Sequence, residues 1–304
     1  MNQPQIYKSN ALVEAQYRLS VAEQRIMLAC ISQVRRDQPI TDNELYSVSA
    51  AEIAAMSDTS TKQAYRELEK AALRLKRREV RLIEEPNGQG RKRKVMLTGW
   101  VQTIIYVEEE GRVELRFTKD MLPYLTQLST QFTKYALADV SQMTSAHAIR
   151  LYELLCQWRT EGKKEWPIEW LREAFQLGDK YPAIKDFKRW VIEPAAEQIN
   201  ELSPMWVKWS QRKTGRRVSH LAFTFGDKAP GKPQKPRKGK TRGKAGGVGQ
   251  NSFQGDSGAR FGVSEATIKA GRKPGEGYED AALRLLEEAK TRRYTDTQDM
   301  FEEA

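Results

Sequence analysis

Residues 181–225 constrain the fold of this chain most strongly, because a helical pattern is followed directly by a strand–turn–strand pattern. In residues 184–200 the apolar side chains recur at helical spacing and share one face of a wheel, with the polar side chains opposite. After Pro204, two β-prone runs flank residues 213–216, where Gly215 supplies the positive φ of a tight hairpin turn. A half-buried helix that leads into a hairpin predicts a winged helix.

The polar residues of this stretch predict contact with DNA. In a winged helix the second helix of the helix-turn-helix enters the major groove, and the hairpin, or wing, contacts phosphates. The alternative is an α/β packing unit whose basic turn is only solvated. Glu193 either accepts a hydrogen bond from a cytosine amino group or pairs with Arg189, and we favour the pairing. The predicted DNA-binding residues here are Lys185, Lys188, Arg189, Glu193, Lys208, Arg212, Lys213, Arg216 and Arg217.

The composition agrees with a polyanionic partner. The 304 residues carry a formal net charge of +11, although charge alone does not separate nucleic acid from an anionic membrane. We find no apolar run near 18 residues and no signal peptide at the first residues, so we expect a soluble, cytoplasmic protein that does not bind membranes. Cys30 and Cys156 fall in apolar helical patterns, which predicts buried free thiols.

A second helix-turn-helix is predicted in the first half of the chain. Ser20 with Glu23 and Ser49 with Glu52 form capping boxes, the first ahead of a long helix and the second ahead of a helix ending near Met56. After a turn at residues 57–60, the helix at 61–77 has one apolar and one cationic side. Its predicted DNA-binding residues are Lys62, Gln63, Arg66, Lys70, Arg74 and Arg77. Alternatively, Glu67 and Glu69 neutralise these cations and the face is merely solvated.

The elements then repeat in order. β-prone runs at 80–84, 95–107 and 113–117, with basic residues 91–94 between the first two, predict a wing with an extra strand. Residues 118–128 read as a helix despite Pro123, and 132–143 as a link to a long apolar helix at 144–158. Both halves give helix, short helix, basic helix and hairpin, which indicates an internal duplication of element order. Pro194 predicts a kink or short break in the second basic helix.

We therefore predict an α+β protein with two winged-helix domains in tandem. The expected divisions are a disordered N-terminus at 1–8, a first domain at 9–140 and a second at 141–226. Residues 227–304 form a basic tail with too few apolar residues to build a core, so it is expected to be largely disordered. Within it, residues 279–294 are amphipathic and form a candidate C-terminal helix.

The sequence offers little for catalysis. His147 and His220 are the only histidines, each inside an apolar pattern, so the H-x-H pair of a nicking endonuclease is absent. Gly239, Lys240 and Thr241 resemble the end of a phosphate-binding loop, but Gln234 stands where its first glycine is required. We expect no enzyme, no catalytic residue, no metal and no cofactor.

Several segments also resemble the iteron-binding plasmid replication initiators. The similar segments, in order, are residues 9–12, 19–25, 151–155, 187–200 (which include Pro194) and 213–223. The resemblance covers about residues 9–225 and excludes the tail.

The resemblance implies that the second domain binds repeated origin DNA while the first contacts the adjacent backbone. It also implies dimers, formed through the first domain, that repress their own promoter on operator DNA. Monomers would open the origin and recruit the host initiator protein and the replicative helicase. The rival hypothesis is a dimeric winged-helix transcriptional repressor without initiation activity.

Overall fold

The computed structural model describes residues 3–35, 38–57, 59–83, 94–229 and two short strands, 259–260 and 263–264. Residues 1–234 form one compact unit and 235–304 another. In the second unit, β12 (Ala259–Arg260) pairs antiparallel with β13 (Val263–Ser264), within the tail predicted to be largely disordered. The rest of the predicted tail beyond residue 229, with its candidate helix at 279–294, lies outside the described residues.

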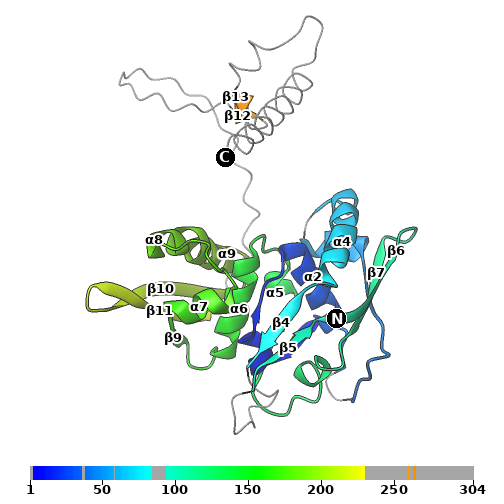
Figure 1. Ribbon diagram of the computed structural model, residues 1–304, viewed down its shortest axis with the longest axis horizontal. Helices are drawn as coiled ribbons and strands as arrows, with labels where there is room; N and C mark the ends of the chain where they lie inside the picture. The colour runs from blue at the N-terminus through cyan, green and yellow to red at the C-terminus, as the bar shows by residue number, and fades with distance from the viewer. Residues whose placement is uncertain are drawn as a thin grey trace, which may run out of the picture. The chain divides into compact units, whose positions relative to one another are not determined.

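The first unit begins with a winged-helix domain, here called WH1 (Figure 1). Its helices are α2 (Val21–Ile31), α3 (Ala50–Ser57) and α4 (Thr61–Leu75), and its sheet has the order β3 (Tyr46–Ser49), β7 (Arg112–Phe117), β6 (Val101–Val107). Both predicted capping boxes are confirmed. The Glu23 amide donates to Ser20 Oγ at 3.3 Å while Glu23 Oε2 accepts from the Ser20 amide at 2.7 Å, and Ser49 and Glu52 repeat the arrangement.

The three predicted β-prone runs at 80–84, 95–107 and 113–117 do not form one wing with an extra strand, contrary to the sequence-based expectation, because they divide between two sheets. β4 (Glu79–Leu82) and β5 (Met96–Gly99) pair with β2 (Gln16–Tyr17) in a separate sheet. Only β6 and β7 share a sheet with β3, the strand that precedes the helix-turn-helix, so β6–β7 is the wing. Of the basic run at 91–94, the first three residues lie outside the described part.

A second winged-helix domain, WH2, repeats this order and confirms the duplication. Its elements are α6 (Ala146–Gln157), β9 (Lys163–Pro167), α7 (Ile168–Ala174), α8 (Ile184–Phe187), the π-helix η2 (Lys188–Ile192), α9 (Glu193–Leu202), β10 (Met205–Thr214) and β11 (Arg217–Asp227). The sheet order β10–β11–β9 matches β6–β7–β3 of WH1, with the wing strand first and the strand before the helix-turn-helix last.

The N-terminus and the link between the domains are more ordered than the sequence suggested. The prediction of disorder for residues 1–8 is wrong from Gln5 onward, since β1 (Gln5–Ser9) pairs antiparallel with β8 (Phe132–Ala136). α1 (Asn10–Val13) follows, capped by the Ser9 hydroxyl. The predicted helix at 118–128 is reduced to a 3₁₀ turn, η1 (Leu122–Tyr124), because Pro123 fits only a first turn. The predicted link at 132–143 contains β8 and α5 (Ala138–Ser141).

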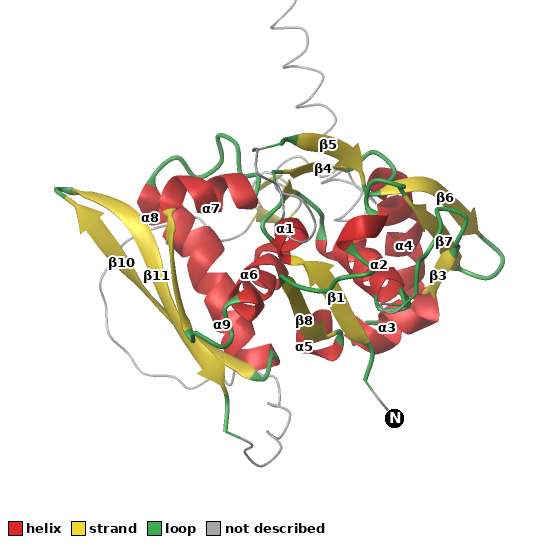
Figure 2. Ribbon diagram, turned by 90° about the horizontal axis from the view of Figure 1, so that it is seen from below, coloured by secondary structure: helices red, strands yellow, loops and turns green. Residues whose placement is uncertain are grey.

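Helix α6 belongs to the cores of both domains. It packs against α9 of WH2 and against α1 and β8 of WH1, and Figure 2 shows it between them. Leu151, Leu154 and Leu155 are completely buried. Cys30 and Cys156 are buried free thiols, as predicted. Among the described residues, no helix is long and apolar enough to cross a membrane.

Candidate nucleic-acid interface

Helix α4 presents an uncompensated cationic stripe. Ser60 caps the helix by accepting from the Gln63 amide at 3.3 Å, and Ala64, Leu68 and Ala71 bury its apolar face. Glu67 accepts from the Gln63 side chain at 3.0 Å, and in the described chain neither Glu67 nor Glu69 forms an ion pair with the stripe. The exposed cations of the stripe on α4 are Lys62, Arg66 and Lys70, and Arg77 is exposed in the turn just beyond the end of the helix at Leu75. Cations without counter-charges suit a phosphate backbone.

Arg74 differs from the other predicted residues of α4 because its guanidinium is engaged by a carboxylate of the protein, although its side chain is 51% exposed. The Arg74 and Arg78 guanidiniums both donate to the fully buried Glu23 carboxylate at 3.1 Å, which fastens the end of α4 to α2. Burial pushes the pKa of Glu23 upward, but the Ser20 amide and the guanidiniums outweigh it and hold the pKa below its usual value. A DNA contact of Arg74 stays a prediction.

The wing of WH1 is acidic at its turn and pinned to α4. The Tyr65 hydroxyl donates to the Glu108 carbonyl at 2.7 Å, and Gly111 lies so close that a Cβ there would be 2.7 Å from the Tyr65 ring. Glu109 and Glu110 are exposed at the turn. These charges oppose a phosphate contact, so α4 is the cationic surface of WH1. This turn lies inside the predicted wing, between the runs 95–107 and 113–117, but the sequence-based prediction did not include the negative charge of Glu108, Glu109 and Glu110.

The second basic helix is interrupted by a π-helix, next to the site where Pro194 predicted a kink. Proline has no N–H, so the Trp190 carbonyl lacks its α-helical donor four residues later. The Glu193 amide instead donates five residues back, to Lys188. The chain therefore keeps its helical course through a wider turn, and α9 continues to Leu202.

Lys185, Arg189 and Glu193 are exposed on this helix, as the predicted interface requires. The favoured pairing of Arg189 with Glu193 is wrong, since no ion pair joins these two described residues. The Arg189 guanidinium instead lies 5.0 Å from the centre of the Trp190 ring. Sequence reasoning missed Trp190, although a large apolar residue on a polar helix face was the available signal.

Arg172 fixes the turn that precedes this helix and was also missed. Its guanidinium donates to the carbonyl oxygens of Tyr181 at 2.7 Å and Lys180 at 2.8 Å. Tyr181 has a φ of 55° in this turn, a conformation that is unfavourable for a tyrosine. Arg172 thereby positions the start of α8.

The wing of WH2 carries free cations at its tip. Strands β10 and β11 meet at Gly215, whose φ is 62°, which confirms the predicted turn. Lys213, Arg216 and Arg217 are exposed there and form no ion pair with any described residue, and Lys208 is exposed farther along β10. Arg212 is instead paired with Glu165 of β9 at 2.5 Å.

Two polar bridges connect the helix of WH2 with its wing. Lys188 Nζ donates to the Gln211 side chain at 2.9 Å. The Asn200 side chain exchanges hydrogen bonds of 2.9 and 2.8 Å with the backbone of Val207. Helix and wing are thus held together as one surface. The described parts of the chain contain no group of His, Cys, Asp and Glu side chains placed to hold a metal ion.

A buried ionic cluster joins WH1 to α6. The Glu153 carboxylate, 1 % exposed, accepts from Lys8 Nζ and the Tyr135 hydroxyl at 2.5 Å and from Arg150 at 2.8 Å. Arg150 also donates to the carbonyl oxygens of Val13 and Ala15. Burial lowers the pKa of Lys8, although the attraction of Glu153 opposes this. Because α6 also carries the core of WH2, the cluster fixes both cationic helices in one framework.

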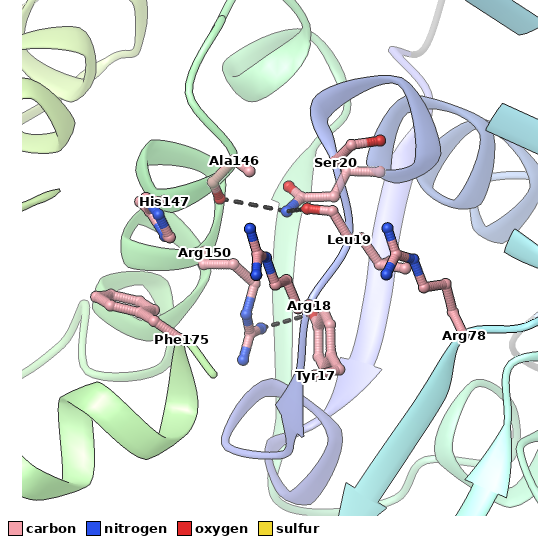
Figure 3. A pocket seen from close by; sticks show the side chains of 10 residues that line it. Tyr17, Arg18, Leu19, Ser20, Arg78, Ala146, His147, Arg150 and Phe175 are labelled. Carbon is pink, nitrogen blue, oxygen red and sulfur yellow. Dashed lines mark hydrogen bonds between the residues drawn. The ribbon is translucent and has the colours of Figure 1, made fainter. Parts of the chain in front are cut away.

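A pocket of about 390 Å³ lies beside this cluster, between residues of WH1 and WH2 (Figure 3). Gln24 bridges it by donating to the carbonyl oxygens of Ala146 at 3.2 Å and Leu19 at 3.3 Å. Burial, together with the cations Arg18 and Lys180, lowers the pKa of His147 to about 4. His147 is therefore neutral near pH 7.

Comparison with known proteins gives matches over both domains. The family model "Initiator Replication protein, WH1" matches residues 5–156, and "Initiator Rep protein, WH2" matches 167–225. An Escherichia coli protein named "Uncharacterized 27.6 kDa protein" is 25% identical over 221 residues, which are 69% of this chain and 91% of that one. A "Replication initiation protein" of Escherichia coli is 27% identical over 230 residues, 73% of this chain and 70% of that one.

Among solved structures, the Pi initiator protein in complex with iteron DNA is similar to this chain with a TM-score of 0.62. The sequence identity is 22%, over 74% of this chain and 98% of that one. At this identity the similarity establishes the fold, two winged-helix domains in tandem.

Proposed function

Because the chain belongs to the family of initiator replication proteins with WH1 and WH2 domains, we propose that it initiates plasmid replication by binding iterons, the repeated sites of an origin, in double-stranded DNA. The observation that carries this proposal is the pair of exposed cationic helices, α4 and α8–η2–α9, held in one framework by α6. The similar Pi initiator protein is bound to iteron DNA, which supports the same class of site for this chain.

We assign the two domains different tasks. The cationic stripe of α4 suits phosphates, whereas the second basic helix mixes Arg189 with Glu193 and Trp190 and suits base edges. WH1 therefore holds the DNA backbone, and WH2 selects the sequence with its helix and grips phosphates with its wing. One repeat is contacted by both domains.

The remaining steps are also part of the proposal. Dimers formed through WH1 bind operator DNA and repress the protein's own promoter, while monomers open the origin. The opened origin recruits the host initiator protein and the replicative helicase in the cytoplasm. The protein acts by binding and deforming DNA and not as an enzyme. Purified protein that cleaves or joins origin DNA through a covalent intermediate would refute this last point.

A dimeric transcriptional repressor is the second candidate, because cationic helices and a basic wing serve any sequence-specific DNA binder. A plasmid carrying only this gene and its upstream repeats separates the two. It should replicate in a suitable host and should fail with Lys62→Ala/Arg66→Ala. Lys134→Ala is the matched control, since this exposed cation of β8 lies over the Tyr7 ring, outside both basic helices. Repression of the promoter without plasmid maintenance would favour the repressor.

A further inference from the structure

Trp190 is unusual among the tryptophans of this protein. Its side chain is 55% exposed, whereas Trp100 and Trp166 are almost completely buried. An exposed ring of this size loses the stabilisation that its burial would give. A large exposed apolar side chain inside a charged surface therefore indicates a site of contact with a binding partner. Trp190 lies on the basic helix of WH2, in the π-helix that Pro194 imposes.

The π-helix determines what surrounds the ring. Phe187, Val191 and Ile192 are buried, so the widened turn holds Arg189 and Trp190 outward together. The Arg189 guanidinium lies over the indole at 5.0 Å, which restricts the guanidinium while leaving its donors available. The pair therefore presents the donors of a restrained guanidinium directly beside an apolar ring edge.

Charge decides what class of partner fits this surface. Lys185, Lys188 and Arg189 lie within one to five residues of Trp190, and Arg189 has no ion pair with a described acidic residue. An apolar protein partner would have to desolvate these cations, whereas a DNA groove supplies phosphates for them. The apolar group that a major groove offers at its base edges is the thymine C5-methyl.

We propose that Trp190 recognises a thymine C5-methyl group in the major groove, next to a guanine recognised by Arg189. This inference rests on the proposed function, because it needs WH2 to bind a defined sequence. Burying one methyl against the indole is worth about fourfold in affinity. Trp190 also positions Arg189, so its removal weakens recognition of the neighbouring guanine as well.

The test uses the full-length protein and a duplex recovered by selection from random DNA. Each thymine of that duplex is replaced in turn by uracil, which removes only the methyl group. The wild type should lose about fourfold in affinity at one position. Trp190→Ala should bind the parent duplex more weakly and lose that single-position penalty, while Trp190→Phe should keep part of it.

Leu202→Ala is the matched control, since Leu202 is also exposed on this helix, at 39%, but lies about 18 Å away along the axis. It should behave as the wild type, and thermal unfolding should show that all three variants fold.

Several results would overturn the inference. A uracil penalty that persists in Trp190→Ala, or equal losses on selected and random duplexes, would show that the ring reads no methyl. A Trp190→Ala defect confined to self-association would assign the ring to a protein contact. If the wild type selects a sequence without any uracil penalty, only this inference fails; if it selects no sequence, the proposed function fails with it.

Discussion

The two winged-helix domains share one order of elements but carry opposite charges on their wings. In WH1 the turn of the wing is acidic and is pinned to α4 by Tyr65. In WH2 the wing is long, and Lys213, Arg216 and Arg217 stand free at its tip. The same topology thus supplies a support for a basic helix in one domain and, in the other, a second cationic surface, which we propose contacts DNA. A duplicated fold does not imply a duplicated interface.

The helices show the same divergence. α4 is a continuous α-helix with a stripe of like charges, whereas the helix of WH2 is interrupted by η2 and mixes positive, negative and aromatic side chains. Cations alone hold a backbone of any sequence, while mixed chemistry distinguishes bases. If this division holds, variants of the two helices should differ in specificity, and both helices should depend on the framework that connects the domains.

Breaking the framework should have the largest effect. Glu153→Ala leaves Lys8 and Arg150 buried without their carboxylate, and should lower the free energy of unfolding by about 3–5 kcal/mol. Urea denaturation measures this. Glu165→Ala, which removes the exposed partner of Arg212, should cost less than about 1 kcal/mol. Similar losses for the two variants would mean that the cluster does not hold the domains together.

The division between the helices predicts different specificity profiles. Arg189→Ala should weaken binding to the selected repeat by about 1–3 kcal/mol and binding to random DNA much less. Arg66→Ala on α4 should weaken binding to both duplexes alike. Titration of both variants on both duplexes gives the answer. Equal losses for Arg189→Ala would place Arg189 on phosphate, and a selective loss for Arg66→Ala would reverse the assignment of the domains.

Acid should weaken the junction of the domains through His147. Its pKa is about 4 in the folded protein and 6.5 in the unfolded chain, so the unfolded chain binds more protons between these values. The free energy of unfolding contributed by His147 is fully present above pH 6.5 and falls by about 2 kcal/mol from pH 7 to pH 5. His147→Gln should remove this part of the pH dependence. An unchanged dependence would exclude His147 as its source.

The wings should differ in their response to salt. Arg216→Ala/Arg217→Ala should reduce the slope of log affinity against log salt by about 2, because two phosphate contacts are lost. Glu109→Gln/Glu110→Gln on the WH1 wing should leave the slope nearly unchanged. The comparison fails if the WH2 variant keeps the full slope or if the WH1 variant changes it as much.

The glycines of the two wing turns give the smallest contrast. Gly215→Ala meets open space and should cost only the left-handed backbone penalty, about 1–2 kcal/mol. Gly111→Ala carries the same penalty and also overlaps the Tyr65 ring, so it should cost about 1 kcal/mol more. Thermal unfolding of both variants measures the difference. Equal losses would mean that Tyr65 moves aside freely and does not pin the wing.

The features that the sequence predicted correctly are those set by neighbouring residues. The capping box of Ser20 and Glu23, the two-sided helix α4 and the turn at Gly215 each depend on a few consecutive positions. Their hydrogen bonds and their apolar spacing can therefore be recognised in a short window.

The features that it missed depend on partners far along the chain. Residues 5–8 look unstructured alone, and only pairing with β8 makes them a strand. The choice between β4–β5 and β6–β7 as the wing depends on which hairpin joins β3, and both hairpins suit strands locally. Lys8 fell within the N-terminus predicted to be disordered because its carboxylate partner, on Glu153, is 145 residues away.

That separation has a consequence for how the protein is made. At about 5–20 residues per second, a ribosome finishes Glu153 roughly 7–29 seconds after Lys8. Until residue 136 is made, β1 lacks β8, and throughout the interval Lys8 lacks the carboxylate that allows it to be buried. WH1 therefore cannot complete its core during its own synthesis and must wait for α6, the first helix of the next domain. The emerging chain is exposed to chaperones and proteases for that time, and a pause in translation before residue 153 would prolong the exposure.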